Sequence, residues 1–117
     1  MSQLRRTQVT TGNDTQTRRF VFVLLNNFTL LSFASALDCL RLANRRSSKP
    51  VYDWVLIGEN GDDVVSSTNT QFKLDDDLIE LYRDDTIILC GGIDIQAATT
   101  KRLLNWVRRE ARKGVRI

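Results

Sequence analysis

A pair of glycines, Gly91 and Gly92, is the first candidate for chemistry in this sequence. They directly follow Thr86–Cys90, an apolar stretch with the composition of a buried strand. Glycines at such a position let the backbone turn sharply and leave amide N–H groups free to face a ligand. The same pair would also suit a tight turn that binds nothing. The Gly-x-Gly-x-x-Gly and Gly-Lys-Ser/Thr patterns are missing, so the sequence does not indicate a phosphate-binding loop.

Four further residues lie near places where a ligand could bind. Asn26, Asn27 and Phe28 follow an apolar run, at what we expect to be the carboxyl edge of a sheet, where open α/β folds bind ligands. Asparagines in such a loop are more often simple turn residues. Asp38 stands on a mostly apolar helical stretch, where it either faces a pocket or flanks the core.

The sequence contains no histidine, which removes several kinds of site from consideration. A Ser–His or Cys–His nucleophile pair, a histidine base and a histidine zinc site all need an imidazole. Cys39 and Cys90 are too few for a zinc site made of cysteines, and their apolar surroundings favour two inert, buried thiols. We expect no metal, no cofactor and no catalysis by these residues; a nucleophile or base would lie beyond Ile117.

The sequence also gives no sign of a membrane segment. No apolar run approaches the ~18–20 residues that span a bilayer. The amino terminus is charged but has no apolar stretch behind it, as a signal peptide would require. We therefore expect a cytoplasmic protein with no membrane partner.

Charge is segregated along the chain. Residues 53–94 contain eleven acidic and two basic residues, a balance of −9, whereas residues 101–116 contain seven basic and one acidic residue, a balance of +6. Blocks of opposite sign can pair within a domain or between subunits. The basic helix at 101–113 could contact DNA phosphates or could be a solvated face. It lacks the second helix and turn of a helix-turn-helix unit.

The apolar periodicity predicts alternating strands and helices. Residues 20–25 read as a central parallel strand, residues 30–44 as an amphipathic helix, and residues 52–58 as a second strand. This order predicts a right-handed parallel crossover. Short strands at 64–65 and 72–74 would form a small flap.

The second half of the sequence continues the same alternation. Acidic residues at 75–77 before an apolar turn at 78–81 resemble a helix start. The segment 86–90 reads as another central strand, residues 98–113 read as a helix that ends before Gly114, and a further strand begins there. We expect an α/β fold with three layers and a mostly parallel open sheet, of the flavodoxin-like kind. With 117 residues, we expect it to be truncated.

Two segments resemble a known family. Residues 22–44, FVLLNNFTLLSFASALDCLRLAN, and Leu89-Cys-Gly-Gly92 are similar to the amino-terminal domain of amidase-like AraC-family transcription regulators. That domain belongs to the DJ-1/PfpI, class I glutamine amidotransferase-like superfamily. In those regulators it precedes two helix-turn-helix units that bind DNA. The resemblance extends over about residues 20–117.

The resemblance implies roles for a few residues. Gly91 and Gly92 match the glycine pair whose backbone lines the superfamily pocket, and Asp38 matches an acid on the first helix. Ser32 departs from the family, in which many members carry an acid, and Ser35-Ala36 stands where many carry Gly-Pro. The family's nucleophile elbow would follow the strand that begins at residue 115.

These observations lead to one main hypothesis. Residues 1–19 form a mobile polar tail, and residues 20–117 form the first part of a DJ-1/PfpI-like domain that senses ligands and dimerises. The effector would be a quaternary amine or an amino acid, and DNA would be bound through a carboxy-terminal domain outside these residues. The pocket wall would comprise Phe28, Asp38, Gly91, Gly92 and Ile93.

The alternative hypothesis is an enzyme. In it, the chain belongs to a DJ-1/PfpI-type thiol hydrolase or glyoxalase-like protein whose nucleophile lies beyond residue 117. A third possibility is that the basic helix and the tail bind nucleic acid directly.

Overall fold

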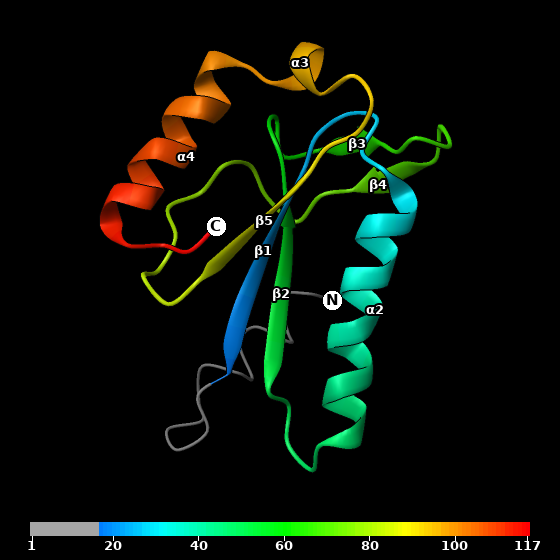
Figure 1. The fold of residues 1–117 in the computed structure, drawn as a ribbon, viewed down its shortest axis with the longest axis vertical. Coiled ribbons are helices and arrows are strands. Elements are labelled where there is room, and N and C mark those ends of the chain that lie inside the picture. Colours follow the sequence, from blue (N-terminus) through cyan, green and yellow to red (C-terminus); the bar gives the residue numbers. More distant parts are fainter. Residues whose placement is uncertain (1–16) are drawn as a thin grey trace.

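The computed structural model describes residues 17–117, in which three parallel strands lie between two long helices (Figure 1). The first strand, β1 (Arg18–Leu24), begins two residues earlier than the sequence predicts. Arg18 N donates to Val51 O at 3.1 Å, and the Arg19 guanidinium donates two hydrogen bonds to Asp85, at 3.0 and 2.7 Å. These contacts place both arginines in the sheet instead of the predicted tail, whose residues 1–16 lie outside the described part.

The first half of the chain forms a parallel β–α–β unit, as the periodicity predicts. Strand β1 leads into α2 (Leu30–Arg46) and then into β2 (Tyr52–Ile57). The two strands are parallel, and their register runs from Arg18 opposite Tyr52 to Val23 opposite Ile57.

Asn44 ties the end of α2 to the start of β2. Its side-chain oxygen accepts hydrogen bonds from Val51 N and Tyr52 N, both at 2.9 Å, and its side-chain nitrogen donates to Tyr52 O at 2.9 Å. One amide therefore satisfies three backbone groups, which fixes the crossover loop.

Strand β5 (Thr86–Cys90) pairs in parallel with the other side of β1, so the order is β2-β1-β5. The central strand of this sheet is β1, and the prediction that residues 86–90 are central is wrong for the described residues. A single parallel bridge between Thr86 and Arg116 lies on the outer side of β5, where Ile87 N donates to Arg116 O at 2.7 Å. The strand predicted to begin near residue 114 is represented by this bridge.

The helix expected at 98–113 is divided in two. A four-residue helix, α3 (Ile95–Ala98), is followed by a break and then by α4 (Lys101–Lys113). The break is set by Thr100, whose side-chain oxygen accepts from Leu103 N at 3.1 Å and so caps α4. Gly114 ends α4 with φ of 104°, in the left-handed region that the sequence predicts for it.

Residues 75–85 form an irregular strap across α4, and the helix start expected at 75–81 is absent. Side chains of α4 bond the backbone of this strap. Trp106 Nε1 donates to Ile79 O at 2.8 Å, Glu110 accepts from Leu81 N at 3.2 Å, and Lys113 Nζ donates to Leu81 O at 2.7 Å. Because these groups already have partners, the strap is held without helical hydrogen bonds.

The expected flap is present as an antiparallel pair, β3 (Asp63–Val65) and β4 (Gln71–Lys73). The sheet has a buried core on each face, which confirms the three-layer α/β prediction. Val21 and Val23 point toward α4, whereas Phe22 and Leu24 point toward α2 and the flap. Figure 1 shows the two helices on opposite sides of the sheet.

Candidate functional site

The loops after β1 and β5 lie side by side at the carboxyl edge of the sheet, as the sequence predicts. Thr29 N donates to Gly91 O at 3.0 Å, and Leu25 N donates to Cys90 O at 3.1 Å. A Cβ atom added at Gly92 would overlap the carbonyl oxygen of Asn27. In this structure, Gly92 therefore lets two loop backbones approach closely.

Phe28 is near the glycine pair, but its side chain points into the core. It is fully buried, and its ring packs edge-on against Phe33 and Phe72 at centroid distances of 5.4 and 5.5 Å. The flap covers it, so its ring belongs to the core between α2 and the sheet.

Asp38 and Ile93 lie on the surface. The Asp38 carboxylate accepts from Arg41 Nε at 2.7 Å, and this hydrogen bond holds the pKa of Asp38 below its ordinary value. Ile93 is 94 % exposed. The structure therefore brings Gly91 and Gly92 beside the Phe28 backbone, but it does not bring Asp38 into that group. As ligand contacts, the five residues stay a prediction.

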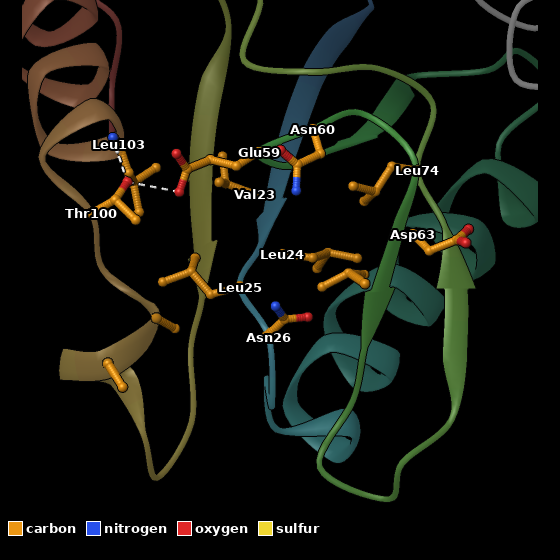
Figure 2. A pocket seen from close by; sticks show the side chains of 13 residues that line it. Val23, Leu24, Leu25, Asn26, Glu59, Asn60, Asp63, Leu74, Thr100 and Leu103 are labelled. Carbon is orange, nitrogen blue, oxygen red and sulfur yellow. Dashed lines mark hydrogen bonds between the residues drawn. The ribbon is translucent and has the colours of Figure 1, made fainter.

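A pocket of about 330 Å³ opens at the same edge of the sheet, but between other elements. It lies between the end of β1, the loop after β2, the flap, and the break that precedes α4 (Figure 2). Its wall combines apolar side chains with polar groups, and more polar than apolar surface faces the space. The lining residues are Val23, Leu24, Leu25, Asn26, Glu59, Asn60, Asp63, Val64, Leu74, Ala97, Ala98, Thr100 and Leu103.

The Glu59 carboxylate connects two parts of the pocket wall. Its Oε1 accepts from the Thr100 hydroxyl at 2.7 Å, and its Oε2 lies 3.9 Å from Arg102. Figure 2 shows this hydrogen bond joining the loop after β2 to the start of α4. Asp63 contributes less, because its carboxylate points away from the pocket and accepts from Gln71 at 3.1 Å.

Four polar lining residues were not among the site residues predicted from the sequence: Glu59, Asn60, Asp63 and Thr100. Glu59 and Asn60 follow the end of β2 just as Asn26 and Asn27 follow β1, so the rule that selected the first loop also applied to the second. Thr100 gave no such signal, because its place depends on a helix break that the sequence did not indicate.

The two thiols differ in environment, and the prediction that both are buried is wrong for Cys39. Cys39 is exposed on α2, whereas Cys90 is buried at the end of β5. Burial raises the pKa of the Cys90 thiol to about 11. A thiol with that pKa is almost entirely protonated at neutral pH, so it is a poor nucleophile.

No helix of the described residues has the length and apolarity to cross a membrane. Among residues 17–117, no three acidic or cysteine side chains gather in a group that could hold a metal ion.

Comparisons with known proteins point to a common relationship. No protein-family model matches the chain. The HTH-type transcriptional regulator GbdR from Pseudomonas aeruginosa is 36 % identical over 96 residues, which is 82 % of this chain and 26 % of that protein. The regulator CdhR of the same species is 32 % identical over 96 residues, 82 % of this chain and 28 % of that protein. The regulator GlxA from Rhizobium meliloti is 35 % identical over 101 residues, 86 % of this chain and 31 % of that protein.

Solved structures support the same relationship. An AraC family transcriptional regulator from Pseudomonas putida superposes with a TM-score of 0.73 at 26 % identity, covering 84 % of this chain and 61 % of that one. A DJ-1 superfamily protein from Agrobacterium tumefaciens has a TM-score of 0.59 at 22 % identity, covering 86 % of this chain and 50 % of that one, and this likeness concerns the fold alone.

The chain thus spans 26 to 31 % of the length of the regulators it matches. Within that region it is 32 to 36 % identical to them, and its open α/β fold is that of a DJ-1 superfamily protein. Over most of its length this chain is therefore similar to HTH-type and AraC-family transcription regulators, and it has the fold of a DJ-1 superfamily protein.

Proposed function

We propose that this chain is the effector-sensing part of a transcription regulator, and that the pocket beside Glu59 receives the effector. One observation carries the proposal. The pocket lies at the carboxyl edge of a parallel sheet, where open α/β folds bind ligands, in a chain related to HTH-type regulators. DNA binding by another part of the protein and assembly as a homodimer belong to the same proposal.

The polar groups of the pocket favour a small cationic effector. Glu59 provides a carboxylate, Asn26 and Asn60 provide amides, and no lysine or arginine of the described residues lines the pocket. The apolar part of the wall consists of leucine, valine and alanine side chains, which suit the carbon skeleton of an amine or amino acid. No aromatic ring lines it, so an ammonium group that donates hydrogen bonds fits better than a quaternary nitrogen, for which rings provide the usual contact.

The pocket is proposed to sense a ligand and not to catalyse a reaction. Cys90 is the buried thiol at this edge of the sheet, and burial raises its pKa to about 11. The effector would act by shifting a population of conformations, because a ligand changes an equilibrium only through its different affinity for the two states. The hydrogen bond between Glu59 and Thr100 is the contact that an effector cation would compete with.

Titration calorimetry tests the proposal. Arginine, carnitine and betaine are titrated into the protein, and we expect saturable heat with at least one of them, arginine before the quaternary amines. Glu59→Gln should weaken that binding about tenfold or more, because the variant loses a charge-assisted contact. Glu80→Gln is the matched control, since it removes an exposed carboxylate of the same kind from a position outside the pocket, and it should leave the affinity unchanged. The absence of heat with all three amines would contradict the proposal.

A further inference from the structure

The outer face of α4 carries a straight row of basic residues. Lys101, Arg108 and Arg112 are separated by seven and four positions, so they lie on one side of the helix. The opposite side contains the buried residues Leu103, Trp106 and Glu110. The row extends about 16 Å along the axis, with about 6 Å between the two arginines. Lys101, Arg108 and Arg112 are called the basic ridge below.

The basic ridge differs from the other basic residues of α4 in having no acidic partner among residues 17–117. Arg102 lies 3.0 Å from Asp77, Arg109 lies 3.6 Å from Glu110, and Lys113 lies 2.9 Å from Glu110. Asp77 from the acidic block and Glu110 from α4 itself therefore pair with the basic residues beside the basic ridge and leave the ridge positive. Because the basic ridge has no counter-charges among residues 17–117, it attracts anions.

A cleft of about 590 Å³ near the carboxyl end of α4 adds three more arginines. Arg18 from β1, Arg83 from the strap and Arg116 from the terminal bridge line it, together with one acid, Asp84. The guanidinium of Arg83 lies close to Gly114, the residue at which α4 ends. None of the three arginines has an ion-pair partner within the described part of the chain. Separate segments thus bring like charges together, which costs free energy unless an anion offsets it.

We propose that the basic ridge and this cleft form a docking surface for the phosphate backbone of duplex DNA. Guanidinium groups match phosphate geometry with paired hydrogen bonds. A duplex presents one phosphate per ~3.4 Å of helix axis on each strand, so a row of cations can meet phosphates on any sequence and in many registers. Duplex DNA is the polyanion to which this surface is exposed, because the chain is related to HTH-type regulators. Such contacts position a protein on DNA and carry no sequence information.

Fluorescence anisotropy with a labelled 20-base-pair duplex of arbitrary sequence tests the proposal on the chain itself. We expect binding at low salt that weakens steeply as salt is added. The variant Arg108→Ala with Arg112→Ala should bind at least about fivefold more weakly, and its plot of log K against log salt should be shallower by about two. Alanine favours helix, so the fold should be kept, and circular dichroism checks this.

The chain offers a matched control in the last turn of the other long helix. Arg45→Ala with Arg46→Ala removes the same charge from exposed positions at the end of α2. If the control loses as much affinity as the ridge variant, binding follows net charge alone and the proposal is overturned.

Two other results would also overturn it. One is no binding of the duplex at 20 mM salt. The other is release of the duplex by an equal charge concentration of polyglutamate, which would identify an acidic protein surface as the better partner. Arginine titration of the ridge variant should be unchanged, so this test and that of the effector pocket fail independently.

Discussion

At the level of single residues, the sequence predicted where Gly91 and Gly92 lie, but it did not predict where the neighbouring Phe28 side chain points. The sequence indicated that Gly91 and Gly92 end a buried strand beside the loop of Phe28, and the contacts confirm this. It could not show that the Phe28 ring enters the core, because the rings that receive it come from α2 and from the flap. A local pattern places a residue at an edge, whereas long-range packing decides which way its side chain points.

The close approach at Gly92 leads to a prediction about stability. Gly92→Ala should destabilise the fold by about 2–3 kcal/mol, because the new methyl group would overlap a backbone oxygen that cannot move independently. Gly91→Ala is the matched comparison. Its methyl group would meet the Cδ1 atom of Ile95 at 2.5 Å, which is the far end of a flexible side chain and can rotate away. Urea denaturation of both variants measures the difference in their free energies of unfolding. Equal losses of stability would contradict the conclusion that the backbone contact requires glycine at position 92 and not at position 91.

The two thiols should differ in reactivity. Cys39 is exposed, whereas burial raises the pKa of Cys90 to about 11. At pH 8, only about one Cys90 thiol in a thousand is ionised, so iodoacetamide should label Cys39 first in the native protein. Mass spectrometry of the Cys39→Ser and Cys90→Ser variants separates the two sites. Equal native labelling would show that Cys90 is accessible.

The same shift gives a direction for stability against pH. Because the folded state raises the pKa of Cys90 above its ordinary value of 9.0, it holds the thiol proton more tightly than the unfolded chain does. This contribution to stability is fully present below about pH 9 and is lost as the pH rises toward 11. Cys90→Ser should flatten the decline of the urea midpoint over that interval.

At the level of elements, the strands and α2 could be predicted because their signals are local. Apolar runs marked β1, β2 and β5, and the spacing of apolar residues marked α2. The strap at 75–85 could not be predicted, because its backbone is held by α4 side chains that lie far away in sequence. Likewise, the break before α4 depends on Thr100 bonding both Leu103 and Glu59.

Glu110 is the residue that should hold the strap most strongly. It is fully buried, accepts from Leu81 N at 3.2 Å, and lies 2.9 Å from Lys113 Nζ. Glu110→Ala should cost about 3 kcal/mol, because it leaves the buried Leu81 N–H without its acceptor and removes the buried carboxylate that pairs with Lys113. Denaturant unfolding measures the loss.

Glu80 provides the control for that variant. It pairs with the same lysine at 3.6 Å, but its side chain is 85 % exposed. Glu80→Ala should change stability by no more than about 0.5 kcal/mol, as is usual for exposed ion pairs. A loss as large as that of Glu110→Ala would mean that charge near Lys113, and not the buried bond to the strap, stabilises this region.

At the level of the whole molecule, alternating strand and helix signals were enough to predict a three-layer α/β fold. They were not enough to place β5 in the sheet, because strand order depends on which neighbours pair and not on how apolar a strand is. Residues 86–90 are as apolar as a central strand, yet within the described chain their outer side meets only residue 116.

This arrangement predicts a distinctive pattern of amide hydrogen exchange. Successive residues of a strand direct their backbone groups to opposite neighbours. Cys90 O accepts from Leu25 N, so Ile88 and Cys90 face β1, whereas Ile87 and Leu89 face outward. Ile87 N donates to Arg116 O at 2.7 Å, and Leu89 N has no such partner among residues 17–117. Exchange measured by NMR should therefore be slowest for Ile88 and Cys90, faster for Ile87 and fastest for Leu89.

If Leu89 were as protected as Ile88, another strand would have to pair along β5. Dilution would then identify its source, because protection by a second copy of the chain falls with concentration and protection within one chain does not.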